Sequence, residues 1–243
     1  MIEFLELSKS YGSFRALAPL NLTVPRGEMF GFLGPNGAGK TTTIRMMMGI
    51  LVPSAGQVRI DGLDCHRESS EVKRHVGYLP DSPIFYDYLR GREILQFIGE
   101  MHNLTRTEAV LRTGRLMAEL GLEEVAEEFA VNYSMGMKKK LGLACALIHE
   151  PSVLILDEPT NGLDPRASRD VQQRLRRSAE QGMTIFLSTH ILDMAERLCS
   201  RIGIIHHGEL VATGSPQELK DNVTAGGTLE EVFLAVTEES DQA

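Results

Sequence analysis

Short hydrophobic runs alternate with longer stretches of helical periodicity along most of the chain, which is the pattern of a sheet covered by helices. The pattern predicts an α/β fold. Turn sequences such as Pro-Arg-Gly and Asp-Gly end several of the early runs, and these runs are closely spaced, so we expect an antiparallel layer beside the core. The early strand candidates are residues 2–7, 20–24, 29–33, 58–60 and 76–79.

Three later hydrophobic runs are long enough for buried strands, at residues 153–156, 184–188 and 202–205. The stretches between them are long enough for crossover helices, so we expect these strands to be parallel. Strand signals disappear between about residues 91 and 149, where Glu, Leu, Met, Ala and Arg dominate with helical spacing. This composition predicts an inserted helical subdomain.

The predicted domain organisation is one domain of residues 1–220, with the helical subdomain at about residues 87–150. Residues 221–243 are expected to form a short C-terminal helix and a tail, because turn-forming residues precede an acidic end. We expect the last residues, from 238 onward, to fray.

Charge and composition disfavour several classes of protein. The chain has 243 residues with 25 Lys and Arg against 33 Asp and Glu, and its formal net charge of −8 argues against a nucleic-acid partner. No hydrophobic run approaches the roughly 18 residues of a membrane-spanning helix, so we expect no direct membrane insertion. The first residues carry acids where a secretory leader carries Lys or Arg, which predicts a cytoplasmic protein. Cys65, Cys145 and Cys199 follow no pairing or metal-binding pattern and are expected to be reduced.

A candidate phosphate-binding loop follows the strand that ends at Leu33. The sequence GPNGAGKTT matches G-x-x-x-x-G-K-[ST] between a strand and a helix. Glycines lack Cβ atoms, so backbone N–H groups can turn toward phosphate oxygens while the next helix points its positive end at them. The alternative is an ordinary glycine-rich turn, which the strand and helix context disfavours. The candidate nucleotide-binding residues here are Gly34, Pro35, Asn36, Gly37, Ala38, Gly39, Lys40, Thr41 and Thr42.

Two adjacent carboxylates extend this site. Lys40 is expected to reach the β- and γ-phosphates, and the Thr41 hydroxyl is placed to ligate Mg²⁺. Asp157 and Glu158 follow a hydrophobic strand, at the end of a parallel sheet where ligands gather. We expect Asp157 to hold the metal and Glu158 to polarise the water that attacks the γ-phosphate. Without the phosphate loop, a solvated acidic turn would be an equally good interpretation of the same pair.

A Ser-x-Gly sequence, Ser134 to Gly136, precedes an amphipathic helix expected at residues 138–149. A serine hydroxyl and free N–H groups at a helix start offer a site for an anion, although serine is also an ordinary N-cap. Its place just before the carboxylate strand is what favours a functional role.

The order of these segments resembles the ATP-binding subunit of an ABC transporter over nearly the whole chain. GPNGAGKTT looks like the family's phosphate loop, YSMGMKKKLGLACAL its signature motif and helix, VLILDEPTNGLDP its carboxylate strand and dimer loop, and FLSTH its switch histidine. The resemblance implies a RecA-like P-loop NTPase core that binds ATP and Mg²⁺. It also implies that Tyr11 stacks on adenine and that His190 contacts the γ-phosphate. Judged from spacing alone, Tyr11 could be a half-buried strand residue and His190 an ordinary hydrogen-bonding residue.

Three residues in two motifs depart from the common family pattern. Asp81 stands where the family usually has a glutamine that links the metal to the helical subdomain, and a shorter carboxylate can still ligate Mg²⁺. Met135 and Met137 replace the usual glycine and glutamine of the signature, while Ser134 and Gly136 remain. Similar substitutions occur in subunits that resemble drug, antibiotic, sodium or polysaccharide exporters, so we expect the exporter type.

The resemblance implies a mechanism that needs two copies, because each chain has one phosphate loop and one signature. ATP would lie between the loop, Asp157, Glu158 and His190 of one copy and the signature of the other, with Asp164 nearby. The dimer would drive separate transmembrane permease subunits, which would hold it at the cytoplasmic face of the membrane. Phe85, Tyr86 and Tyr88 are either a docking site for those subunits or a small core.

Other classes of function stay open at this point. A non-transport ABC-type ATPase would ordinarily carry coiled-coil insertions, zinc modules or tandem cassettes. A regulatory module that binds ATP without cleaving it is suggested by Asp81 and Met135. A P-loop kinase of another family would leave the signature and the switch histidine unexplained. Residues 138–140 and the Arg174, Arg176 and Arg177 cluster are expected to be solvated helix faces, and the remaining histidines show no metal-ligand spacing.

Overall fold

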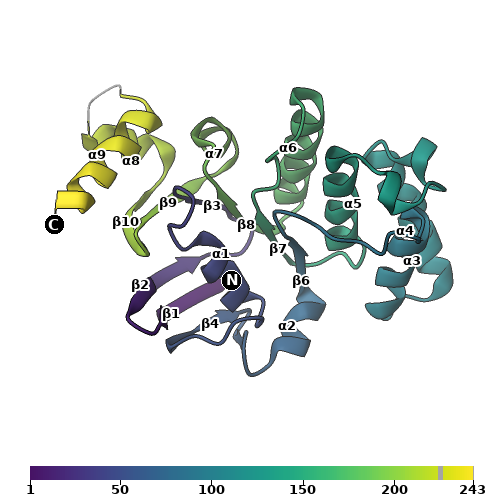
Figure 1. Ribbon diagram of the computed structural model, residues 1–243, viewed down its shortest axis with the longest axis horizontal. Helices are drawn as coiled ribbons and strands as arrows, with labels where there is room; N and C mark the ends of the chain where they lie inside the picture. Colours follow the sequence, from purple (N-terminus) through teal and green to yellow (C-terminus); the bar gives the residue numbers. More distant parts are fainter. Residues whose placement is uncertain (224–226, 243) are drawn as a thin grey trace. The chain divides into compact units, whose positions relative to one another are not determined.

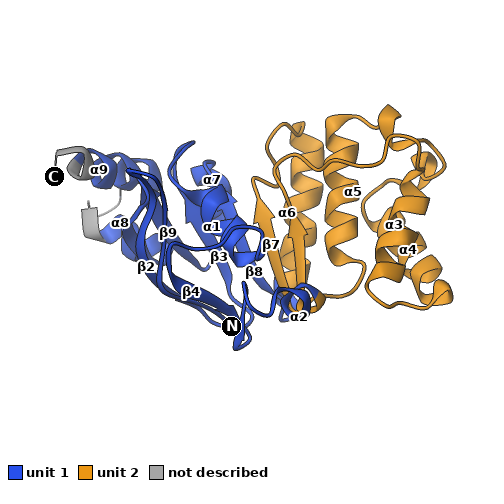
Figure 2. Cartoon of the chain, turned by 60° about the horizontal axis from the view of Figure 1, so that its bottom comes forward, with its two compact units in different colours: residues 1–73, 179–243 blue, residues 74–178 orange. Residues whose placement is uncertain are grey.

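The early strand candidates at residues 2–7, 20–24 and 58–60 pair into an antiparallel sheet, as their spacing predicts. The candidates at residues 29–33 and 76–79 were wrongly expected in that layer: each pairs in parallel with a strand much later in the chain, which a long crossover places beside it. A computed structural model describes residues 1–223 and 227–242 (Figure 1). Contacts divide the chain into two units, residues 1–73 with 179–243 and residues 74–178 (Figure 2). In the first unit the antiparallel sheet has the order β2-β1-β4-β5. Its strands are β1 (Ile2–Tyr11), β2 (Phe14–Val24), β4 (Ala55–Ile60) and β5 (Leu63–Asp64).

A second set of strands in the same unit is mainly parallel. Strand β3 (Met29–Leu33) lies between β8 (Thr184–Thr189) and β9 (Arg201–His206) and is parallel to both, which confirms the predicted parallel arrangement. Strand β10 (Glu209–Gly214) runs antiparallel to β9 after the two-residue turn His207-Gly208. Both turn residues have positive φ, which suits the tight two-residue hairpin that they form.

The helices of the first unit are short and cover its sheets. They are α1 (Lys40–Met47), α7 (Leu192–Leu198), α8 (Pro216–Val223) and α9 (Leu229–Gln242), and α2 (Ser69–His75) leads into the second unit. Helix α9 continues to Gln242, so the backbone through residues 238–242 is helical, where we had expected it to fray. Of the expected turn at residues 221–227, residues 224–226 lie outside the described part of the chain, as does residue 243.

Aromatic packing joins the two sheets of the first unit. Phe186 of β8 is completely buried. Its ring centroid lies 5.7 Å from that of Phe30 and 5.4 Å from that of Phe32, both on β3. It also lies 5.9 Å from the ring of Phe4 on β1, so the antiparallel layer packs on the strands that flank the phosphate loop.

The second unit contains the predicted helical stretch. Its parallel strands are β6 (Val76–Leu79) and β7 (Val153–Asp157). Its helices are α3 (Gly91–Met101), α4 (Arg106–Glu119), α5 (Met135–Leu147) and α6 (Pro165–Glu180), with short turns η1 (Glu123–Val125) and η2 (Ala130–Asn132). Helix α5 begins three residues earlier than predicted, because the Ser134 hydroxyl caps it by accepting a hydrogen bond from the Met137 N–H at 3.2 Å.

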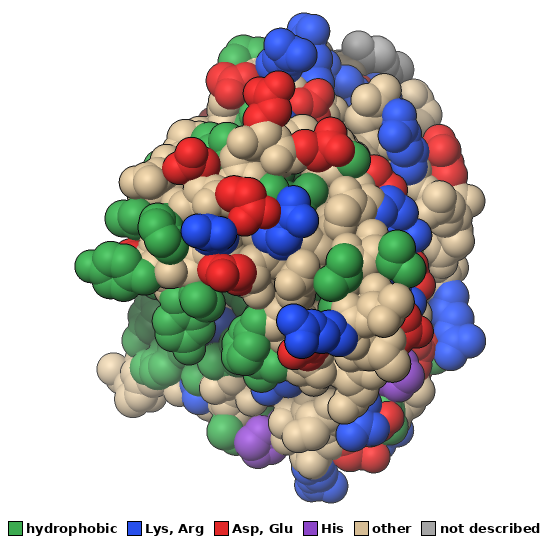
Figure 3. Space-filling view, turned by 90° about the vertical axis from the view of Figure 1, so that its right-hand side faces the viewer, with side chains coloured by type: hydrophobic (Ala, Val, Ile, Leu, Met, Phe, Trp, Pro, Cys, Tyr) green, Lys and Arg blue, Asp and Glu red, His purple; other side chains and the backbone are tan. Residues whose placement is uncertain are grey.

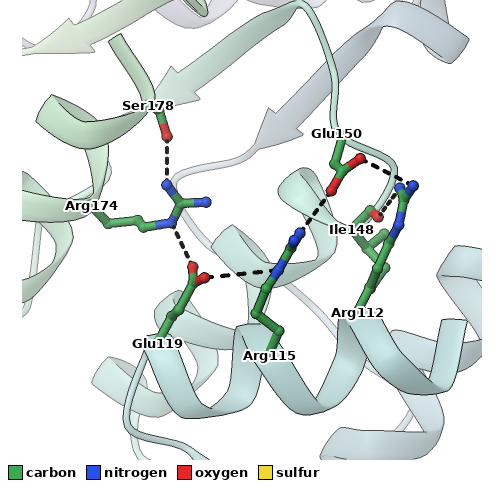
Figure 4. A network of polar contacts seen from close by, with 7 residues as sticks. All are labelled: Arg112, Arg115, Glu119, Ile148, Glu150, Arg174 and Ser178. Carbon is green, nitrogen blue, oxygen red and sulfur yellow. Dashed lines mark hydrogen bonds and ion pairs between the residues drawn. The ribbon is translucent and has the colours of Figure 1, made fainter. Parts of the chain in front are cut away.

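A polar network ties helix α4 to helix α6 and to the chain before β7 (Figure 4). Arg115 of α4 pairs with Glu150 at 2.8 Å and with Glu119, and Arg112 pairs with Glu150 at 3.0 Å. Arg174 of α6 pairs with Glu119 at 3.1 Å and donates to the Ser178 hydroxyl at 3.0 Å. The guanidinium of Arg174 is therefore an internal structural group, so its predicted place on a solvated face is wrong.

The lysines of helix α5 also differ from expectation. Lys139 is 2% exposed, although residues 138–140 were expected to form a solvated face. The helix begins at residue 135, and its packing turns position 139 toward the interior of the second unit. Lys140 pairs with Asp170 at 3.0 Å, while Arg176 and Arg177 are exposed as predicted.

Candidate functional site

The backbone of the phosphate loop has the conformation that its glycines permit. Gly37 and Gly39 have φ of 86° and 107°, the left-handed region that other residues rarely adopt. A Cβ atom on Gly39 would lie 2.8 Å from the Ala16 carbonyl oxygen, and one on Gly34 would lie 2.4 Å from the Ile205 carbonyl oxygen. The glycines at both positions are therefore required by close packing against neighbouring strands.

Neighbouring strands also support the loop from outside. The Gly208 N–H, in the β9-β10 turn, donates to the Ala38 carbonyl at 3.0 Å, and the Ala18 N–H donates to the Gly208 carbonyl at 2.8 Å. The loop thus rests on a hairpin from the end of the chain and a strand from its beginning. This support fixes the backbone before any ligand is bound, which reduces the entropy lost on binding.

Lys40 is the buried cation of the loop. It is 6% exposed, and its Nζ donates to the Gly34 carbonyl at 2.6 Å and to the Pro35 carbonyl at 3.1 Å. The loop therefore curls around its own lysine. Thr41 follows on the exposed side of the first turn of α1, next to the half-exposed Thr42. The helix N-terminus, the loop N–H groups and the lysine together form a site for polyphosphate oxygens.

His190 lies beside this loop. Strand β8 pairs with β3 so that Thr189 is opposite Leu33, and the Gly34 N–H donates to the Thr189 carbonyl at 3.3 Å. His190 is the next residue and is exposed. The structure thus brings the switch histidine to the start of the phosphate loop, two segments that lie more than 150 residues apart in the sequence.

Tyr11 ends strand β1 and is 51% exposed. It is paired with Phe14 across the hairpin, and the Lys9 ammonium lies 5.1 Å from its ring centroid. The ring is therefore an accessible surface, as a base-stacking role requires, and no neighbour buries it in the core.

The two carboxylates lie in the second unit at the end of β7. Asp157 is 2% exposed and Glu158 is 7% exposed. Glu158 has a φ of 47°, and a non-glycine residue in this region stores backbone strain of roughly 1–2 kcal/mol. Strain of this kind persists where a side chain must point in one direction, which is consistent with a functional role for Glu158.

Asp81 lies beside these carboxylates because β6 pairs with β7 and Leu79 is opposite Leu156. Lys139 donates to the Asp81 carbonyl at 2.5 Å and to its carboxylate Oδ1 at 3.2 Å. The Asn161 amide donates to the same Oδ1 at 3.3 Å. Burial lowers the pKa of Lys139 from its ordinary value, while the negative charges of Asp81, Glu158 and Asp157 act to raise it.

The signature segment contacts the loop that follows the carboxylates. The side chain of Met135 lies against Gly162, where an added Cβ would be 2.3 Å from the Met135 sulfur. A Cβ at Gly136 would lie 3.6 Å from Leu163. Asp164, one residue later, accepts the Arg166 and Ala167 N–H groups at 2.9 Å and caps helix α6, and these bonds lower the pKa of its carboxyl group.

The predicted residues thus form two groups. The phosphate loop, Tyr11 and His190 lie in the first unit, and Asp81, Asp157, Glu158, Ser134 and Gly136 lie in the second. Lys139 and Asn161 belong to the second group and were missed by the sequence analysis. In a run of three lysines, the sequence gives no sign of which one is buried. Asn161 stands three residues after Glu158, and this closeness to the carboxylates is a signal that could have placed it at the site.

Other chemistry-bearing residues form no additional centre. Among the residues that the structure describes, no group of three or more His, Cys, Asp and Glu side chains could hold a metal ion. The cysteines are free, as expected, and burial raises the pKa of Cys65 and Cys199 to about 12. The described helices include none that is both long enough and apolar enough to span a membrane.

Comparison with known proteins places this site in a family. The family model for "ABC transporter" matches residues 17–161, more than half of the chain. YbhF of Escherichia coli, named a probable multidrug ABC transporter ATP-binding protein, is 37% identical to this chain over the whole chain. This chain spans 42% of the length of YbhF. The bacitracin transport ATP-binding protein BcrA of Bacillus licheniformis is 40% identical to this chain. The match covers 87% of this chain and 68% of the length of BcrA.

Solved structures agree with this assignment. An ATP-binding subunit of an ABC transporter matches with a TM-score of 0.91 and 34% identity, covering 98% of this chain and 99% of that one. A dimeric ATP-binding cassette, solved after hydrolysis with ADP and Pi, has the same fold at 23% identity, with a TM-score of 0.81 over 88% of this chain and 98% of that one. Family model, relatives and fold agree, so the chain belongs to the ABC transporter family, among its ATP-binding proteins.

Proposed function

We propose that this chain binds and hydrolyses ATP and that the energy of this cycle drives export through separate transmembrane subunits. The observation that carries the proposal is the preformed phosphate loop, in which Lys40 is buried and the glycine backbone is held open by neighbouring strands. The Gly34–Thr42 segment binds the triphosphate, and Tyr11 stacks on the adenine. Residues 1–220 form the ATP-binding domain in this proposal, and residues 221–243 a C-terminal addition.

The catalytic roles follow from the donor groups. Lys40 neutralises the β- and γ-phosphates, Glu158 orients and polarises the attacking water, and His190 contacts the γ-phosphate. Thr41, Asp157 and Asp81 offer hydroxyl and carboxylate oxygens, the donor set that suits Mg²⁺. The metal supplies charge neutralisation on the phosphate oxygens when it is bound.

The signature completes the site in a second copy of the chain. Ser134 caps helix α5, and Ser134 and Met135 are both exposed, so this end of the helix is accessible to a ligand held by another molecule. The dimeric state of the related cassette supports this arrangement. Each charge-assisted hydrogen bond to phosphate contributes about 1.5–3 kcal/mol, so a few per site are enough to close a dimer.

Shared sites make the rate of hydrolysis depend on dimer formation. We expect the initial rate of phosphate release to rise more than linearly with protein concentration, at saturating ATP and Mg²⁺, until the dimer predominates. Specific activity measured over a dilution series checks this expectation. Specific activity that stays constant down to the lowest measurable concentration, with a monomer seen by light scattering, would contradict the shared site.

The transmembrane partner is proposed to dock on an exposed hydrophobic surface beside helix α3. This aromatic surface is lined by Phe85, Tyr86, Tyr88, Leu89 and Phe97 around a hollow of about 600 Å³. Tyr86 is 72% exposed and Tyr88 is 84% exposed, which supports a docking surface over a small core at these two residues. Figure 3 shows hydrophobic side chains gathered on this side of the molecule. Exposed apolar patches of this kind mark interaction sites.

Removal of two rings tests the docking surface. The double substitution Tyr86→Ala and Tyr88→Ala is expected to weaken association with the membrane subunit by about tenfold or more, since exposed aromatic anchors dominate interface energies. ATP hydrolysis by the isolated chain should change by less than about twofold, because neither ring touches the phosphate loop. Co-purification from membranes measures the association. Ile50→Ala, 61% exposed in the first unit, is the control, and an equal loss in both variants would argue against a specific surface.

The names of the relatives indicate the class of cargo and the location. They include multidrug, bacitracin and linearmycin transport or resistance proteins, so we propose a drug or antibiotic-like cargo for the complex. The chain is then cytoplasmic and peripheral, held at the inner face of the membrane by its permease partner.

A further inference from the structure

Lys139 occupies a position that lysine rarely takes. Its side chain is 2% exposed within helix α5, and fully buried ammonium groups occur almost only where they are paired. Its partners are the carbonyl and the carboxylate of Asp81, at 2.5 and 3.2 Å. Helix α5 therefore places a fixed positive charge against Asp81, two residues after the end of β6.

The two oxygens of the Asp81 carboxylate have different surroundings. Oδ1 accepts from Lys139 at 3.2 Å and from Asn161 at 3.3 Å. Oδ2 faces the Ser82 hydroxyl at 3.5 Å, and the side chain as a whole is 44% exposed. Lys139 and Asn161 thus hold Oδ1, while a large part of the Asp81 side chain stays exposed to solvent.

The charge of Lys139 also acts on the neighbouring carboxylates. Besides Asp81, the charges of Asp157 and Glu158 interact with the ammonium group. Of these three acidic residues, Asp81 is the one that Lys139 contacts directly, so the ammonium charge acts most strongly on the Asp81 carboxylate. A fixed ammonium among them repels a second cation, because like charges a few ångströms apart inside a protein are weakly screened.

We propose that Lys139 is a positioning residue that competes with the divalent cation for Asp81. It holds Oδ1 and the loop backbone in place, and it lowers the metal affinity of the site so that the metal nucleotide is released more readily. This inference rests on the proposed function, since it assumes that Asp81 faces the metal nucleotide. It adds a determinant of metal dependence that the sequence analysis did not contain.

The test compares nucleotide binding with and without metal. The dissociation constant of a fluorescent, non-hydrolysable ATP analogue is measured in Mg²⁺ and in EDTA. The constant in EDTA divided by the constant in Mg²⁺ reports how much the metal strengthens binding. Lys139→Gln removes the charge and keeps a donor, and we expect it to increase this ratio about tenfold. Lys139→Met should change the ratio in the same direction and also lower the thermal midpoint, because the Asp81 carbonyl loses its donor. Lys139→Arg, which keeps the charge, should retain the wild-type ratio.

Two controls separate this role from a structural one. Lys138→Gln, the neighbouring position on the same helix, should leave the ratio unchanged. In an Asp81→Asn background, Lys139→Gln should alter the ratio by about twofold or less, because the competition for that carboxylate is gone. An unchanged or smaller ratio in Lys139→Gln, or the same increase with and without Asp81, would overturn the inference. Loss of nucleotide binding by the wild-type chain in both conditions would instead contradict the proposed function.

Discussion

Glu158→Gln is expected to lower ATP turnover by about 10²–10⁴-fold while leaving ATP binding intact, because it removes a general base and changes little else. The side chain is 7% exposed and directly follows Asp157, so glutamine fits the same space. Its backbone has a φ of 47°, which fixes the direction in which the side chain leaves strand β7. Steady-state phosphate release and equilibrium binding of ATP measure the two properties separately.

Oligomeric state gives a second readout for this variant. Without hydrolysis the bound ATP continues to bridge two copies, so Glu158→Gln with ATP should elute as a stable dimer. The matched control is Glu150→Gln, a carboxylate of the same unit that pairs with Arg112 and Arg115. It should keep normal turnover. Normal hydrolysis by Glu158→Gln would exclude its role as the base.

Lys40→Ala should weaken ATP binding by about 100-fold, because at least one charge-assisted contact of about 1.5–3 kcal/mol to the phosphates is lost. The same change removes the donor to the Gly34 and Pro35 carbonyls, so the loop loses its internal support as well. Calorimetric titration with ATP and Mg²⁺ measures the affinity.

The control for Lys40→Ala is Arg45→Ala, which removes an exposed cation from the same helix. Its ATP affinity should stay within about twofold of the wild-type value, since an exposed charge on the far side of the helix is screened by solvent and salt. If Lys40→Ala binds ATP as tightly as the wild-type chain and both proteins are folded, the loop is not the phosphate site.

Much of the fold was predictable because local patterns and tertiary packing agree. The early strands carry hydrophobic residues at the positions that become buried, and the closely spaced runs at residues 2–7, 20–24 and 58–60 pair into one antiparallel sheet. The start of helix α5 was less predictable. Gly136 is a poor helix former in the first turn, and the helix nevertheless begins at Met135 because Ser134 caps it.

The burial of charged side chains was where sequence reasoning failed. Lys139 and Arg174 look like their exposed neighbours in the sequence, but each finds an acidic partner supplied by another element. Partners that are tens of residues away in sequence leave no local pattern, since burying a charge depends on what the fold places opposite it.

Within the candidate site, the sequence by itself determined the chemistry. The glycine spacing of the phosphate loop and the place of Asp157 and Glu158 at the end of a hydrophobic strand could be read from the sequence, whereas the role expected of His190 came from the family resemblance. Tertiary structure alone decided what supports these groups: His190 beside Gly34 through the pairing of β8 with β3, and Asp81 held by Lys139 and Asn161. The physical reason is that the type and spacing of side chains are local properties of the chain. Strand pairing and the pairing of buried charges depend on segments that only folding brings together.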